Sequence, residues 1–226
     1  MLRLRLSLRI IAPLAKIRSM QIQVFSDVVC PWCYIGTVRL DRALQATGID
    51  AVVSYRPFMI AADAPPGGFN VADDLRLRYG VDPRLLWARA EAEAKESGLD
   101  LDLAKQPMSY PTAAAHTLVR HAAPRGTQRP LVRALFATYF QEARDISDPQ
   151  VLAEVATRHG FSANEVTSLV TDPTELATTR RAVNEAFALG IRGAPFYVIN
   201  DAVSFSGAQP EEVFRQILDE VRQVAP

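Results

Sequence analysis

The fold is decided by the stretch QIQVFSDVVCPWCYIG, which spans residues 21–36. Its first seven residues have the alternation of a short strand, and this strand leads directly into Cys30 and Cys33. Beyond the cysteines, apolar residues recur at helical spacing up to Gly48, a residue suited to ending a helix. Residues 51–55 then read as a second strand. The sequence therefore predicts a β-α-β unit with both cysteines just past the end of a strand.

A long helical block follows this unit. Helical periodicity extends over residues 65–189 and is clearest over residues 132–143. Capping patterns predict three further helix starts, at Asp148-Pro149, at Ser162 with Glu165, and at Asp172-Pro173 with Glu175.

The chain then returns to strands, over residues 196–200 and 203–206, and ends in a helix that begins at Pro210. Because the strands of a sheet must be adjacent, the helical block has to bulge out between the second and third strands. We expect an α/β fold in which residues 20–63 and 190–226 build one domain and residues 64–189 form an all-helical insertion.

The pair Cys30 and Cys33 carries the chemistry that the sequence predicts. Only a thiolate attacks a disulfide, and unpaired N–H groups in the first turn of a helix stabilise a thiolate. Pro31 needs no N–H donor there, and Cys33 lies one turn further on. We expect Cys30 to attack and Cys33 to resolve. The alternative is half of a zinc site, whose partners His116 and His121 have an i, i+5 spacing that suits one helix face poorly, so no metal is expected.

Composition limits the partners. The 226 residues include 25 Lys and Arg and 25 Asp and Glu, so no net positive charge is available to hold a nucleic acid. Two cysteines cannot build the disulfide framework of a small secreted protein. Residues 1–19 are basic and apolar without a signal-peptide cleavage pattern, which favours a disordered or non-native extension, with organellar targeting as the alternative. Nothing else is long enough to cross a membrane, and we expect a cytoplasmic protein.

A second motif, residues 190–195 with the sequence GIRGAP, leads into the third strand. A proline after two glycines is by itself an ordinary loop residue. After a β-α-β dithiol unit, however, Pro195 stands where thioredoxin-like proteins carry a cis-proline beside the cysteines, so we expect a cis Ala194–Pro195 bond. Such a proline keeps metals away from the thiols and leaves the backbone of Ala194 free to pair with an extended substrate.

The stretch Ser26 to Gly36 resembles the active site of DsbA-family thiol-disulfide oxidoreductases of the FrnE-like branch. The likeness continues at residues 56–58, 144–149, 190–195 and 206–210, and so runs from about Met20 to the C-terminus. It implies a thioredoxin fold with a helical insertion and a catalytic pair Cys30 and Cys33. It also implies active-site support from Pro31, Trp32, Ala194 and Pro195.

One position departs from that branch. This chain has Pro111 where the branch carries an asparagine shortly before the histidine segment. His116 is a candidate substrate-binding residue, and the alternative is a helix residue that lies under the insertion.

Three functions are open on the sequence. The first is oxidation, reduction or isomerisation of disulfides in a protein or small molecule through a mixed disulfide on Cys30, with no cofactor beyond the cysteine pair and glutathione as a co-substrate. The second is glutathione-dependent isomerisation or conjugation, as in the similar kappa-type glutathione transferases and hydroxychromene-carboxylate isomerases, which usually carry serine at the position of Cys30. The third is a redox-gated or zinc-bound interaction module.

Overall fold

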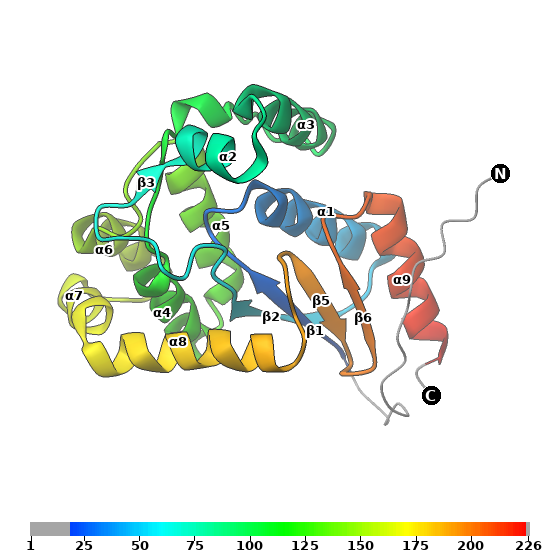
Figure 1. Cartoon of the computed structure of the whole chain (residues 1–226). Helices are drawn as coiled ribbons and strands as arrows, with labels where there is room; N and C mark the ends of the chain where they lie inside the picture. Colours follow the sequence, from blue (N-terminus) through cyan, green and yellow to red (C-terminus); the bar gives the residue numbers. More distant parts are fainter. Residues whose placement is uncertain (1–18, 225–226) are drawn as a thin grey trace.

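A computed structural model describes residues 19–224 and contains a four-stranded sheet with helices packed around it (Figure 1). The strands, in the spatial order β2-β1-β5-β6, are β2 (Ala51–Pro57), β1 (Met20–Ser26), β5 (Phe196–Ile199) and β6 (Val203–Ser206). β1 and β2 run parallel, whereas β5 pairs antiparallel with both β1 and β6. The predicted α/β class, with the first and last strands in one sheet, is confirmed.

The helix α1 (Pro31–Thr47) begins and ends as the sequence predicts. Cys30 is its N-cap residue, Pro31 occupies the first turn, and Gly48 takes a left-handed conformation with φ 63° at its end. α1 lies beside α9 (Glu211–Val224) on one face of the sheet (Figure 1). That face carries Ile22 and Val24 of β1, which belong to the main apolar core.

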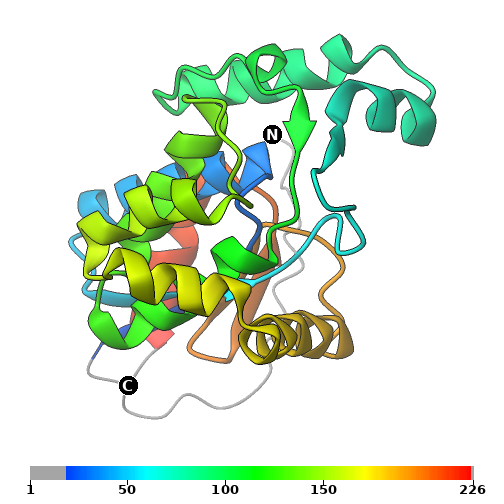
Figure 2. The ribbon, with the colours of Figure 1, turned by 90° about the vertical axis from the view of Figure 1, so that its left-hand side faces the viewer.

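Seven α-helices lie between β2 and β5 in the described part of the chain. They are α2 (Val71–Tyr79), α3 (Pro83–Glu96), α4 (Ala113–Ala122), α5 (Gln128–Phe140), α6 (Pro149–Ala156), α7 (Ala163–Thr171) and α8 (Pro173–Ala188). α4 to α7 stack beside the sheet, and α8 runs along it (Figure 1). α2 and α3 form a separate layer over the start of α1, seen at the top of Figures 1 and 2. We call these two helices the roof.

The expectation of an all-helical insertion is wrong in one detail. β3 (Phe69–Asn70) and β4 (Met108–Ser109) form a two-stranded antiparallel ladder at the two ends of the roof segment. Each strand has only two residues, which is too short to show the alternation that marks a strand in a sequence. The ladder brings together the points where the chain enters and leaves the roof.

Two local predictions in the insertion are also corrected. The helix expected over residues 132–143 ends at Phe140, and Ala143 has a positive φ of 53° in the turn that follows. Asp172 caps α8 through the N–H of Thr174, but Glu175 does not complete a capping box, because its carboxylate binds Arg120 and His121 of α4. The box predicted at the start of α7 is present.

A buried amide joins the insertion to the edge of the sheet. The Gln128 side chain accepts a hydrogen bond from the N–H of Tyr55 at 2.8 Å and donates to the carbonyl oxygens of Tyr55 and Val119 at 3.1 and 3.0 Å. It therefore satisfies the outward-facing backbone groups of β2, which would otherwise be buried without partners. The basic extension predicted over residues 1–19 lies outside the described residues except for Ser19. Between residues 19 and 224, no helix has the length and apolar character needed to span a bilayer.

Candidate active site

The turn between β1 and α1 places the two cysteines about one helical turn apart. The N–H of Cys30 donates to the carbonyl of Asp27 at 3.1 Å, and the carbonyl of Cys30 accepts from the N–H groups of Cys33 and Tyr34 at 3.0 and 3.2 Å. Both thiols are free, with Cys30 5% exposed and Cys33 fully buried. Only Cys30 is therefore close to the surface.

The two thiols differ in what their surroundings favour. Burial raises the pKa of Cys33 well above its ordinary value of 9.0, because a thiolate loses its solvation there, and the neighbouring Cys30 raises it further. The N–H of Asp27 contacts the Cys33 sulfur at 3.5 Å and acts in the opposite direction. Cys33 is therefore a neutral thiol at pH 7 and must lose a proton before it can act as a nucleophile.

The proline loop lies directly beside Cys30. The Ala194–Pro195 peptide bond is cis, as predicted. The Cys30 thiol points to the carbonyl oxygen of Ala194 at 3.9 Å, and the carbonyl of Pro195 accepts from the N–H of Gly207 at 2.8 Å. A loop far along the chain thus meets the dithiol.

Beneath the cysteines lies a buried polar pair that the sequence did not lead us to expect. Asp27 is 1% exposed, and its carboxylate accepts from the N–H of Ile60 at 2.8 Å and lies 3.2 Å from Nε2 of His116. His116 is 4% exposed and does not line the cavity described below. An acidic residue inside the apolar stretch before Cys30 was the signal that could have indicated this pair.

The two histidines of the zinc alternative have different carboxylate partners. His116 contacts Asp27, whereas Nε2 of His121 lies 2.9 Å from the Glu175 carboxylate. Within the described residues 19–224, no group of three or more His, Cys, Asp or Glu side chains is placed to hold a metal ion.

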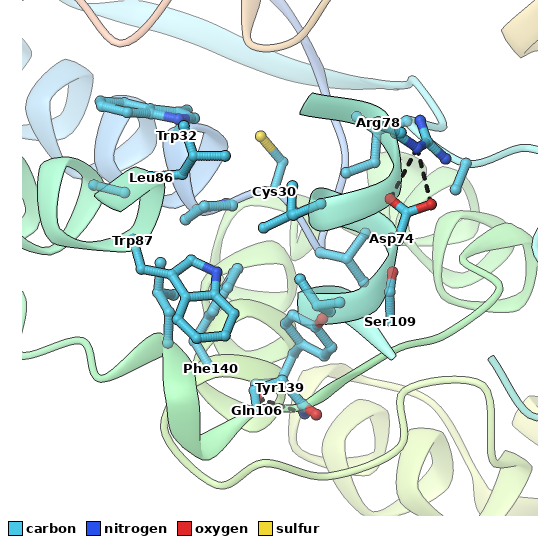
Figure 3. Close-up of a pocket in the computed structure, with 18 of the residues that line it drawn as sticks. Cys30, Trp32, Asp74, Arg78, Leu86, Trp87, Gln106, Ser109, Tyr139 and Phe140 are labelled. Atoms are coloured by element: carbon cyan, nitrogen blue, oxygen red, sulfur yellow. Dashed lines mark hydrogen bonds and ion pairs between the residues drawn. The ribbon is translucent and has the colours of Figure 1, made fainter. Parts of the chain in front are cut away.

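A cavity of about 520 Å³ opens over Cys30 (Figure 3). Cys30, Pro31 and Trp32 supply its floor, the roof supplies one wall, and the end of α5 supplies another. Its six aromatic lining residues are Trp32, Phe69, Tyr79, Trp87, Tyr139 and Phe140. Figure 3 shows the Cys30 sulfur between Trp32 on one side and the ion pair of Asp74 with Arg78 on the other. Apart from residues 30–32, no sequence motif indicated these residues.

The roof is held in place by a buried arginine of α1. Arg39 forms an ion pair with Glu93 of α3, and its Nε donates to Ser97 at the end of that helix at 2.8 Å. Its Nη1 donates to the carbonyl of Ala208 at 2.8 Å. The side chain therefore connects the helix that carries the thiols both to the roof and to the loop beside Pro195.

A dithiol at the start of the first helix, a cis-proline beside it and a β2-β1-β5-β6 sheet define a thioredoxin-fold dithiol protein. The chain belongs to the family of the DSBA-like thioredoxin domain, whose model matches residues 21–219. The DsbA-family resemblance and the thioredoxin fold are thereby confirmed, and membership places the chain among DsbA-like oxidoreductases.

Three known proteins are similar to this chain in sequence or in fold. The probable DsbA oxidoreductase SCO1869 from Streptomyces coelicolor is 32% identical, with a TM-score of 0.80 and 89% of each chain covered. The 2-hydroxychromene-2-carboxylate isomerase of Sphingobium xenophagum is 21% identical over 198 residues, which cover 88% of this chain and 98% of that protein. The cytosolic disulfide reductase DsbM from Pseudomonas aeruginosa, solved with GSH, shares the fold at 18% identity and a TM-score of 0.60, covering 90% of this chain and 99% of DsbM.

Proposed function

We propose that this protein is a thiol-disulfide oxidoreductase that works by exchange at Cys30 and Cys33. The observation that carries the proposal is the unequal burial of two free thiols in one helical turn. Cys30 lies on the floor of a cavity, whereas Cys33 has no access to solvent. This supports Cys30 as the attacking thiol and Cys33 as the resolving thiol.

The exchange proceeds in two steps. The Cys30 thiolate attacks one sulfur of a substrate disulfide, the substrate S–S bond breaks, and one half leaves as a thiolate while the other half stays bonded to Cys30. Cys33 then loses its proton and attacks the Cys30 sulfur, which releases the second half and leaves a Cys30–Cys33 disulfide. The substrate gains two electrons and the protein loses two. Run in reverse, the same steps oxidise a dithiol.

The surrounding residues are proposed to support these steps. Pro31 starts the helix whose N–H groups face Cys30, and Trp32 forms the cavity floor beside it. The backbone of Ala194 before Pro195 is proposed to pair with a substrate. His116 is proposed to act on the dithiol through Asp27 rather than by substrate contact, because it is buried behind that carboxylate.

Glutathione is the proposed co-substrate that returns the oxidised protein to its dithiol form. The similarity in fold to DsbM, a cytosolic disulfide reductase solved with GSH, supports both this choice and a cytoplasmic location. The second candidate is a glutathione-dependent isomerase, supported by the hydroxychromene-carboxylate relative and by an aromatic cavity large enough for a small molecule.

The test is a titration of the protein in glutathione redox buffers, in which free thiols are trapped with a mass-tagging alkylator. We expect a reversible transition that involves two thiols. In Cys33→Ser the transition should be replaced by a stable mixed disulfide on Cys30, and Cys30→Ser should react with neither glutathione nor a disulfide substrate. The proposal is refuted if both thiols stay reduced at every ratio of reduced to oxidised glutathione. Glutathione-dependent isomerase turnover that survives in Cys33→Ser would favour the second candidate.

A further inference from the structure

We infer that the cavity over Cys30 selects a low-molecular-weight aromatic disulfide that carries a carboxylate, in preference to a disulfide within a folded protein. This inference rests on the proposed exchange at Cys30 and specifies the substrate class of that site.

The fold restricts access to the Cys30 thiol. Cys30 is only 5% exposed, and the roof lies over the start of α1 beside it (Figure 1). The roof is fixed by Arg39 with Glu93, and by the carboxylate of Glu91, which accepts from the N–H of Leu103 at 2.8 Å. A disulfide on a folded domain cannot reach a thiol enclosed in this way, whereas a small molecule can enter a cavity of about 520 Å³.

The lining indicates the chemistry of the occupant. The aromatic rings come from three helices: Trp32 from α1, Trp87 from α3 of the roof, and Tyr139 and Phe140 from α5. The hydroxyl of Tyr139 donates to the carbonyl of Met108 at 2.9 Å, so its polar end already has a partner. A flat apolar group bonded to the attacked sulfur would therefore have aromatic faces and edges on several sides.

Charge adds a further requirement. The cavity is lined by Asp74, Arg78 and Arg89, two cations against one anion. Asp74 forms an ion pair with Arg78 at 2.9 Å. Arg89 has no carboxylate partner among residues 19–224, and its guanidinium stands over the Trp32 ring, 5.5 Å from the ring centroid. A carboxylate on the aromatic group would pair with Arg89 through charge-assisted hydrogen bonds.

The chemical step is the one described for the proposed function. Cys30 takes one aryl thiol as a mixed disulfide and releases the other as a thiolate. Cys33 then displaces the bound aryl thiol, and two equivalents of glutathione reduce the Cys30–Cys33 disulfide and become glutathione disulfide. One aromatic disulfide thus becomes two aryl thiols at the expense of two electrons from glutathione.

The test is a single-turnover reaction of the reduced protein with three disulfides: dithiodibenzoate (aromatic, anionic), dithiodianiline (aromatic, neutral) and hydroxyethyl disulfide (aliphatic, neutral). Each rate is divided by the rate with free dithiothreitol, which corrects for the reactivity of the disulfide itself. We expect the corrected rates to fall in that order, with steps of about tenfold.

Matched variants on one helix locate the selectivity. Leu86→Ala, which shortens a cavity residue, should lower the two aromatic rates relative to the aliphatic rate by several-fold. Leu85→Ala, at a neighbouring site 70% exposed and outside the cavity, should change none. Arg89→Gln should lower the dithiodibenzoate rate about tenfold and spare dithiodianiline. Arg84→Gln, which lies outside the cavity, is its control.

Two results would overturn the inference while leaving the proposed function intact. The first is equal corrected rates for all three disulfides, with no effect of Leu86→Ala or Arg89→Gln. The second is reduction of the disulfides of insulin faster than dithiodibenzoate. Failure of the wild-type protein to exchange with any disulfide would instead refute the proposed function itself.

Discussion

Gly36, the single glycine within α1, should be difficult to replace, because it lies where this helix crosses β5. A Cβ atom at this position would collide with the hydroxyl of Tyr197 and come within 3.3 Å of Cγ of Pro195. Tyr197 is fully buried and has no space into which to withdraw. Alanine is favoured over glycine in a helix by about 1 kcal/mol, whereas overpacking costs about 1–3 kcal/mol. Because Tyr197 is fully buried, we place the cost of overpacking in the upper part of this range, about 2–3 kcal/mol, so after the alanine preference is subtracted Gly36→Ala should lower the free energy of unfolding by roughly 1–2 kcal/mol.

A double-mutant cycle separates this collision from any other effect. The Tyr197 hydroxyl has no hydrogen-bond partner among residues 19–224, so Tyr197→Phe should be neutral or stabilising. With the hydroxyl gone, Gly36→Ala should lose only a few tenths of a kcal/mol, which gives a coupling energy of about 1–2 kcal/mol. Urea denaturation of the four reduced proteins measures it. The same loss in both backgrounds would refute the assignment of the strain to this contact.

Three further perturbations test other parts of the structure. Burial raises the pKa values of Cys33, Tyr139 and Tyr197, so at alkaline pH the native state holds protons that the unfolded chain releases. The stability that these three groups contribute is complete below about pH 9 and should decline above it. A urea midpoint that stays unchanged up to about pH 10.5 would contradict these raised pKa values. Gln128→Leu leaves the N–H and carbonyl of Tyr55 without partners and should lower the free energy of unfolding by about 2–4 kcal/mol in urea denaturation. Gln45→Leu, at an exposed site, is the control and should change it by no more than about 0.5 kcal/mol. Arg39→Met removes the bonds between α1 and the roof, so iodoacetamide should label Cys30 faster in the folded protein; an unchanged labelling rate would show that the roof does not limit access.

Local chemistry decided which parts of the fold were predictable from the sequence. The start of α1 at Pro31 and its end at Gly48 depend on residues within one turn, and so does the capping box at Ser162. The box expected at Asp172 fails for a reason outside its own turn. Glu175 has a stronger pairing with Arg120 and His121 of a different helix than with the backbone N–H of its own cap residue.

The candidate site divides in the same way. Cys30, Cys33 and Pro195 were predictable because a short spacing or a loop motif marks each of them. The roof was not, since Trp87 and Arg89 come to line the cavity over Cys30 only through the packing of α3 over α1, and nothing in their own segment indicates that packing. The pairing of Asp27 with His116 joins residues 89 positions apart and could be read only from the structure.

α1 performs three tasks whose residues follow one another along the helix, and this links the chemistry to the fold. Cys30 and Cys33 occupy its start, Gly36 permits its close approach to β5, and Arg39 holds the roof. A displacement of α1 at Gly36 would therefore move Cys33 relative to Pro195 and also shift the anchor of the cavity wall. Because interiors are close-packed and transmit strain, substitutions one or two turns from the cysteines should alter exchange rates as well as stability. For that reason the rate of mixed-disulfide resolution in Gly36→Ala is expected to recover with Tyr197→Phe in parallel with the free energy of unfolding.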